Sequence, residues 1–334
     1  MRRLILCLLA TIPASGAAQQ PPPILDMHMH ALAADAQGPP PIAICAPFDE
    51  LPAWDPARPY REVVLERRKG EVPCDDPLWS AETDEALMRA TIAVMERRNI
   101  VGVLGGTPER VAAWRAAAPG RFIAGIDFNP LADGAITPDS LRRLVRSGAV
   151  DVLAEVLTQF AGIAPDDERL EPYWSVAEEL DVPVGIHVGP GPPGVHYLGA
   201  TGYRARLHSA LSLEEMLVRH PRLRVWIMHA GFPLLDDLLA LLYAHPQVHV
   251  DVGLIAFAMP RAIFHRYLRA IVDAGFANRV MFGSDQMVWP GAIERAIAAI
   301  EEAPFLTEQQ KRAILYDNAA RFLRLDETGK AGNE

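Results

Sequence analysis

The stretch Ile24-Leu25-Asp26-Met27-His28-Met29-His30 is a short apolar run that ends in two histidines separated by one residue. Alternate residues of a β-strand face the same side, so a strand here would point His28 and His30 in one direction. One metal ion could then take both imidazoles as ligands. A single His-x-His pair is a weak signal, and its weight depends on what the later strands carry.

Seven further apolar runs follow this one, and longer amphipathic segments lie between them. The alternation is typical of repeated β–α units around a parallel sheet. Eight strands in strict order predict an α/β fold, the (β/α)8 TIM barrel, while an open doubly wound sheet is the structural alternative. The predicted strands are residues 24–30, 100–104, 122–126, 150–156, 182–187, 223–229, 248–252 and 280–282.

The segments between the strands predict the helices of the barrel. Two helix starts match the capping-box pattern, because Ser212 precedes Glu215 by three residues and Thr307 precedes Gln310 by three. The predicted helices are residues 82–98, 108–117, 172–180, 213–219, 234–243, 260–274 and 291–302.

Residues 31–80 are too long and too rich in proline to be an ordinary connection. We expect a long insertion after the first strand, packed as a flap over one mouth of the barrel, where it could shape a substrate pocket. The alternative is a surface excursion held down by its own aromatic side chains. These are Phe48, Trp54, Tyr60 and Trp79.

Length and composition are those of one globular domain. The chain has 334 residues, of which 50% are hydrophobic and 22% charged, which supports a large buried core. We expect the barrel domain to span residues 19–325, with a disordered polar tail at 326–334.

The first 18 residues have the features of an export signal. Arg2 and Arg3 precede an apolar run over residues 4–12, and small residues follow up to Ala18. A membrane anchor is the alternative, but the run is well short of the roughly 20 residues that a spanning helix needs. We therefore expect a cleaved signal peptide at 1–18, a periplasmic or secreted protein, and no membrane attachment after cleavage.

Loss of the signal removes two arginines and changes the net charge from −10 to −12. So acidic a protein is a poor match for nucleic acid, which leaves a small molecule as the expected partner. The oligomeric state stays open. In an oxidising compartment Cys45 and Cys74 could form a disulfide, and two unpaired buried thiols are the alternative.

Three more chemically active side chains lie at or just after the carboxyl ends of predicted strands. His187 ends residues 182–187, His229 ends residues 223–229, and Asp285 follows the last strand. The carboxyl ends of parallel barrel strands gather at one mouth, so these side chains should meet there with the first-strand pair. Imidazole plus carboxylate with an open position for water is the ligand set of a catalytic zinc. Taken singly, each could be a hydrogen-bonded core histidine or a helix cap.

The ordered set of motifs resembles the amidohydrolase superfamily, in particular the branch that contains aminocarboxymuconate-semialdehyde decarboxylase. The resemblance covers residues 24–325 and implies a barrel, a divalent metal and usually hydrolysis. It is carried by LDMHMH at 25–30, GIHVG at 185–189, IMHAG at 227–231, MFGSD at 281–285 and ILYDNAARFL at 314–323.

The resemblance also implies roles for particular residues. His229 and Asp285 would act in catalysis, Asp285 by moving protons. Glu155 falls on the fourth strand, where one subtype of the superfamily has a glutamate that bridges two metals, and a salt bridge in the barrel wall is the alternative. Zinc suits this ligand set, and manganese would also fit, as one or two ions. The implied metal ligands are His28, His30, Glu155, His187, His229 and Asp285.

We therefore expect a metal-dependent hydrolase that cleaves an amide, lactone or ester bond of a small molecule. The alternatives are a mononuclear decarboxylase, in which Glu155 binds no metal and His229 is an acid or base, and a non-catalytic metal- or ligand-binding protein. Arg204 and Arg206 follow the fifth strand and could hold a substrate carboxylate. We expect most of the remaining histidines to be surface residues. They are His196, His208, His220, His245, His249 and His265.

Overall fold

The computed structural model of the protein describes residues 20–51, 53–70 and 72–325. The predicted signal peptide at 1–18 and the predicted tail at 326–334 lie outside the described residues, so both stay predictions. None of the described helices is long and apolar enough to cross a membrane.

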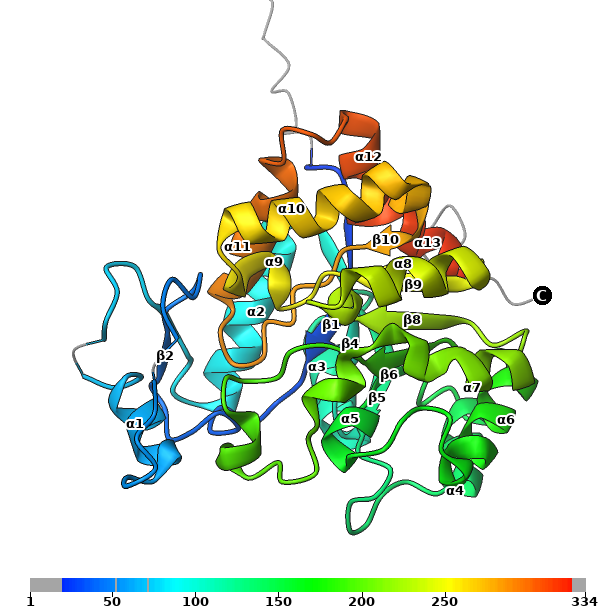
Figure 1. Ribbon diagram of the computed structural model, residues 1–334, viewed down its shortest axis with the longest axis horizontal. Helices are drawn as coiled ribbons and strands as arrows, with labels where there is room; N and C mark the ends of the chain where they lie inside the picture. The colour runs from blue at the N-terminus through cyan, green and yellow to red at the C-terminus, as the bar shows by residue number, and fades with distance from the viewer. Residues whose placement is uncertain (1–19, 52, 71, 326–334) are drawn as a thin grey trace, which may run out of the picture.

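Eight parallel strands form one sheet in the order of the chain, which confirms the predicted barrel (Figure 1). Two backbone hydrogen bonds join the first strand to the segment after the last. Met27 N–H donates to Phe282 O at 2.9 Å, and Asp285 N–H donates to His28 O at 2.7 Å. The strands are β1 Ile24–His30, β4 Ile100–Gly105, β5 Phe122–Phe128, β6 Val152–Val156, β7 Val184–His187, β8 Val225–Met228, β9 Val248–Asp251 and β10 Val280–Met281.

Helices connect the strands and surround the sheet, as expected for a barrel (Figure 1). All seven predicted helices are present, and α4 is one of several additional helices. The longer helices are α2 Asp84–Arg98, α3 Pro108–Ala117, α4 Pro138–Arg146, α6 Glu171–Glu179, α8 Leu235–Ala244, α10 Arg261–Ile271 and α11 Gly291–Glu301, and the shorter ones include α7 Glu214–Arg219, α12 Glu308–Arg312 and α13 Asn318–Leu323.

One of the two predicted capping boxes is present. Thr307 N–H donates to the Gln310 side chain at 2.9 Å, and Gln310 N–H donates back to Thr307 Oγ1 at 3.2 Å. The other is wrong, because Ser212 lies inside the 3-10 turn Ala210–Leu213. That turn runs directly into α7, so no side chain caps the helix.

The barrel interior is a packed core rather than a pore. Leu25 and Met27 of β1 belong to a buried cluster that also contains Trp226 of β8 and Phe322 of α13, whose ring centroids lie 5.7 Å apart. The register of β1 shifts between Asp26 and Met29. Because of this shift, Met29 joins the outer core while the histidines beside it face the interior.

The segment between β1 and α2 contains α1 (Tyr60–Glu66) and a small hairpin of β2 (Ala43–Ile44) and β3 (Leu78–Trp79). It lies to one side of the barrel in Figure 1. The predicted disulfide between Cys45 and Cys74 is present, with a Cα–Cα distance of 5.8 Å. Whether this segment is an insertion relative to other barrels stays a prediction.

This segment is tied to the loops at the carboxyl ends of the strands. Phe48 N–H donates to Ala258 O at 2.7 Å, and Trp289 Nε1 donates to Ile42 O at 3.1 Å. The Tyr60 hydroxyl donates to Pro193 O at 3.0 Å, in the loop after β7. The segment therefore contributes to the same mouth of the barrel that the strand-end histidines reach.

Candidate active site

The structure brings all six predicted metal ligands into one buried cluster at the carboxyl ends of the strands. Each of them is at most 7% exposed. His28 and His30 come from β1, Glu155 from β6 and His187 from the end of β7, while His229 directly follows β8 and Asp285 follows β10.

Four overlapping sets of three residues could hold a metal ion, and two of them, the first and second groups below, consist only of predicted ligands. The other two sets add Asp251 to His28 and His229, and Asp127 to His30 and Glu155.

In the first group, Asp285 Oδ1 lies 3.1 Å from His30 Nε2 and 3.8 Å from His28 Nε2. Three donor atoms thus face a common space, with two nitrogens and one oxygen. This is a donor set that divalent zinc and manganese both accept.

The second group consists of Glu155, His187 and His229. His187 Nδ1 lies 2.6 Å from Glu155 Oε1 and 3.1 Å from His229 Nε2. The other Glu155 oxygen, Oε2, lies 3.8 Å from His30 Nε2 of the first group. Glu155 therefore presents one oxygen to each group.

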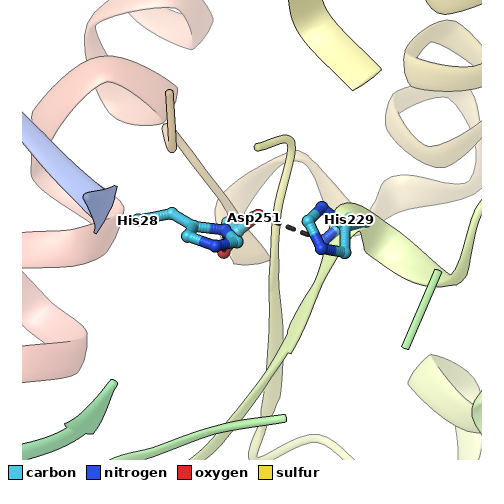
Figure 2. A group of neighbouring side chains, drawn as sticks. All are labelled: His28, His229 and Asp251. Atoms are coloured by element: carbon cyan, nitrogen blue, oxygen red, sulfur yellow. Dashed lines mark hydrogen bonds and ion pairs between the residues drawn. The ribbon is translucent and has the colours of Figure 1, made fainter. Parts of the chain in front are cut away.

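The outer nitrogen of three of the histidines has an oxygen partner. His229 Nδ1 lies 3.0 Å from Gly253 O, and because a carbonyl only accepts, this nitrogen carries a proton. His28 Nδ1 lies 3.2 Å from Asp251 Oδ2. Figure 2 shows His28 and His229 next to Asp251. The Nε2 atoms are thereby left to face the cluster, which is how outer partners orient metal-binding histidines.

His30 follows the same pattern, since its Nδ1 lies 3.0 Å from Asp127 Oδ2. Its backbone is fixed by Gln286, whose side chain accepts from His30 N–H at 3.1 Å and donates to His30 O at 2.7 Å. His187 has the opposite orientation, with Nδ1 toward the cluster. Four imidazoles thus direct one nitrogen each toward the space between the two groups.

The acidic surroundings shift the pKa values of the cluster. Burial lowers the pKa of His28, but the charges of Asp285 and Asp251 outweigh burial and raise it to about 9. Burial, together with the charges of His187 and His28, lowers the pKa of His229 to about 4. Burial raises the pKa of Glu155, but its hydrogen bond to His187 and the nearby positive charges bring it below the usual range. At neutral pH His229 is neutral and Glu155 is ionised.

Several buried polar atoms of the cluster have no hydrogen-bond partner among the described residues. They include His28 Nε2 and Asp285 Oδ1, which both belong to the first group. Unpaired buried polar atoms are expensive, and an unpaired buried charge is more so. A divalent cation would satisfy such nitrogen and oxygen atoms, so the residues fit the metal that the sequence implies.

The backbone around the cluster is locally strained. The backbone φ angles of His229, Leu254 and Asp285 are 59°, 58° and 51°. These values lie in the left-handed region, which residues other than glycine rarely adopt. Strain of this kind costs of order 1–3 kcal/mol per residue and concentrates at functional sites. Here it turns the chain so that the side chains after β8 and β10 point into the mouth.

Sequence reasoning missed Asp127 and Asp251, which orient ligands from outside. Each stands at or near the end of a predicted strand, as Asp285 does, so the same strand-end criterion could have found them. Asp251 also accepts hydrogen bonds from Trp226 Nε1 at 3.0 Å and from Gly253 N–H at 2.8 Å. Gln286 had no comparable signal.

The two predicted substrate arginines lie apart from the cluster. Arg204 and Arg206 are exposed, and the Arg204 guanidinium donates to the carbonyl oxygens of Thr201 and Tyr203, both at 2.8 Å. Substrate binding by either stays a prediction.

Among the six histidines outside the cluster, only His196 is exposed and four are partly buried, and the surface assignment is wrong for His220. It is buried, with Nε2 2.8 Å from Glu171 and Nδ1 3.4 Å from Glu178. Two carboxylate partners compensate for the loss of solvent around the buried imidazole. The spacing of histidines in the sequence did not reveal these partners.

A family model described as "Amidohydrolase" matches residues 25–325. The chain belongs to the amidohydrolase family. No curated protein sequence is significantly similar to it. The match spans every strand of the barrel, so family membership covers the whole described cluster.

Three solved structures illustrate the likeness of fold. A 2,6-dihydroxybenzoate decarboxylase from Rhizobium is 17% identical, with TM-score 0.55, covering 91% of this chain and 98% of that chain. A 5-carboxyvanillate decarboxylase from Novosphingobium aromaticivorans, complexed with manganese and a nitrobenzoic acid, is 18% identical, with TM-score 0.51 and coverage of 70% and 79%. A protein described as a probable 2-pyrone-4,6-dicarboxylic acid hydrolase, from Acinetobacter baumannii, is 17% identical, with TM-score 0.56 and coverage of 90% and 98%. At these identities the likeness shows a shared fold.

Proposed function

We propose that the protein is a metal-dependent hydrolase that cleaves an amide, lactone or ester bond of a small molecule. The observation that carries this proposal is the pair of ligand groups joined by Glu155, whose two oxygens lie 2.6 Å from His187 Nδ1 and 3.8 Å from His30 Nε2. A carboxylate shared between two sets of nitrogen ligands is suited to two divalent ions, and hydrolysis is a common use of such paired ions.

The ligands would be divided between the two ions. His28, His30 and Asp285 would hold the first ion, His187 and His229 the second, and Glu155 would contact both. When bound, divalent ions lower the pKa of water toward neutrality and polarise a carbonyl oxygen. We propose zinc, because its borderline character suits mixed imidazole and carboxylate ligands, with manganese as the alternative.

Proton movement would depend on Asp285. It lies at the centre of the first group and is only 3% exposed, so it is shielded from bulk water. Its carboxylate would accept the proton of the attacking water and deliver it to the leaving group. Asp251 and Asp127 would hold His28 and His30 in the orientation that keeps Nε2 toward the cluster.

A decarboxylase with one metal is the second candidate. The short contact between Glu155 Oε1 and His187 Nδ1 favours it, because read as a hydrogen bond it makes Glu155 an orienting partner rather than a ligand. His229 would then be free to act as an acid or base. Two of the structurally similar proteins are named as decarboxylases, which also supports this candidate.

Metal removal and reloading would separate the candidates. The protein would be stripped with a chelator, reloaded with zinc or manganese, and assayed for hydrolysis of p-nitrophenyl acetate, a p-nitroanilide and a γ-lactone. Release of CO2 from 2,6-dihydroxybenzoate and 5-carboxyvanillate would be measured in parallel. We expect hydrolysis that disappears with chelation and returns with metal. Metal-dependent CO2 release without hydrolysis would support the decarboxylase instead.

We also propose that the protein is exported, on the basis of the pattern in residues 1–18. Expression of the full chain in a bacterium, followed by fractionation and mass measurement, would test it. A periplasmic product that begins near residue 19 is expected, and a full-length product retained in the cytoplasm would contradict it.

A further inference from the structure

The loop after β7 starts directly behind the candidate ligand His187, and side chains hold both polar backbone groups of Gly189 in this loop. Gln159 Oε1 accepts from Gly189 N–H at 3.1 Å, and the Tyr203 hydroxyl lies 2.8 Å from Gly189 O. The same hydroxyl accepts from Gly191 N–H at 2.9 Å. Tyr203 and Gln159 are both buried. Two buried side chains therefore fix the backbone that follows His187.

Gly189 packs directly against the second candidate ligand, His229. A Cβ on Gly189 would lie 2.6 Å from the Cβ of His229, so only a glycine allows this approach. A backbone bond joins the same two segments, because Gly231 N–H donates to Val188 O at 3.0 Å. Within the cluster, His187 Nδ1 lies 3.1 Å from His229 Nε2. A shift of the loop at Gly189 would therefore change how the two imidazoles face each other.

His208 connects this loop to the segment after β8. Its Nε2 lies 2.7 Å from the Tyr203 hydroxyl, and its Nδ1 lies 3.1 Å from Phe232 O. Because a carbonyl only accepts, Nδ1 carries a proton. Nε2 accepts the hydroxyl proton in the neutral imidazole and donates to the hydroxyl oxygen in the imidazolium, so the link to Tyr203 exists in both states. Phe232 N–H donates to His229 O at 3.0 Å, which completes the connection to the ligand.

We propose that Tyr203 and His208 are positioning residues that set the separation of His187 and His229 as metal ligands. Among the described residues between β7 and α7, the only regular elements are short 3-10 helices, so no strand or long helix supports the start of the loop. The Tyr203 hydroxyl supports it instead, and His208 anchors that hydroxyl to the segment that carries His229. The inference rests on the proposed function, because it takes both histidines as ligands of the second ion.

The main test uses Tyr203→Phe, which removes only the hydroxyl. Zinc affinity would be measured on the full protein by competition with a chromogenic chelator, together with the midpoint of chemical denaturation. We expect the affinity for the weakest-bound ion to fall about tenfold, the lower end of the effect of removing outer partners of metal ligands. His208→Leu should cause a similar loss. The double variant should lose little more than either single variant, because both residues act through one link.

Tyr173→Phe is the matched control. Tyr173 is a buried tyrosine of α6, outside the cluster, and its hydroxyl donates to Ile136 O at 2.7 Å. This variant should lower the denaturation midpoint but leave zinc affinity unchanged. In protein loaded with Co2+, the visible absorption spectrum reports the geometry of the ligands, so it should change in Tyr203→Phe and not in the control. His208→Gln keeps an amide that can bond to the Tyr203 hydroxyl, and it should restore part of the affinity that His208→Leu loses.

Unchanged zinc affinity in Tyr203→Phe or in His208→Leu, an equal loss in Tyr173→Phe, or losses that add in the double variant would overturn the inference. These measurements need no turnover, and the weakest-bound ion can be followed whether the native protein binds one ion or two. A protein whose zinc affinity depends on Tyr203 and His208 as expected, but which never hydrolyses a substrate, would contradict only the proposed function.

Discussion

Replacement of Asp251 by Asn should weaken metal binding although no predicted ligand is changed. Asp251 Oδ1 accepts from the backbone N–H groups of His229 at 3.1 Å and Gly253 at 2.8 Å, and Oδ2 accepts from Trp226 Nε1 at 3.0 Å. Oδ2 also lies 3.2 Å from His28 Nδ1. All of these neighbours are donors, and an ionised carboxylate can serve them all.

An asparagine keeps one of the two acceptor oxygens. Whichever way its amide turns, the NH2 group faces two donors and two buried donors lose their acceptor. An unsatisfied buried donor costs about 1–3 kcal/mol, so we expect the free energy of unfolding to fall by about 3 kcal/mol. Because either His28 loses its orienting partner or the backbone of His229 loses its acceptor, metal affinity should fall about 10–100-fold.

Chemical denaturation would measure the stability, and competition with a chromogenic chelator would measure the metal affinity. Asp133→Asn is the matched control, because Asp133 is exposed in a loop and has no described ion pair. An Asp251→Asn protein with the metal affinity and stability of the wild type would refute the reasoning that Asp251 orients the cluster.

Three further predictions concern turnover, the disulfide and the barrel wall. Asp285→Asn should keep the fold but reduce turnover by about 10²-fold or more, because the proton acceptor is lost, and near wild-type turnover would remove Asp285 from the mechanism. Cys45→Ser opens a loop with a sequence separation of 29 residues. Chemical denaturation should show a loss of about 3–4 kcal/mol, and unchanged stability would contradict it. Gly185→Ala would place a Cβ 2.4 Å from Ala154 O, which is backbone and cannot turn away. We expect thermal denaturation to show a loss of about 3 kcal/mol, and a variant as stable as the wild type would show that the strands can separate there.

The fold was predictable because each barrel strand is a buried apolar run with a clear boundary. Five of the six clustered side chains were predictable for a related reason, since parallel strands deliver their carboxyl ends to one mouth whatever the connecting helices do, while Glu155 was implied only by the family resemblance. That rule needs only the end of each strand, and His187, His229 and Asp285 all stand there. No long-range contact has to be known in advance.

The remaining features depend on contacts that strand patterns do not encode. The register shift in β1 changes which residues face inward, and it was invisible in the alternation of apolar and polar residues. Asp251 acts on His28 from a strand six positions away in the sheet order.

The number of metal ions per chain is the most direct test of the central claim, the shared role of Glu155. Native protein and Glu155→Gln would be loaded with zinc, dialysed together and analysed by mass spectrometry, with Glu178→Gln as a control. Glu178 is a glutamate paired with the buried His220, outside the cluster. We predict close to two ions per chain for the native protein and the control, and close to one for Glu155→Gln, with hydrolysis lost in parallel. A native protein that never exceeds one tightly bound ion, together with an active Glu155→Gln variant, would contradict the account.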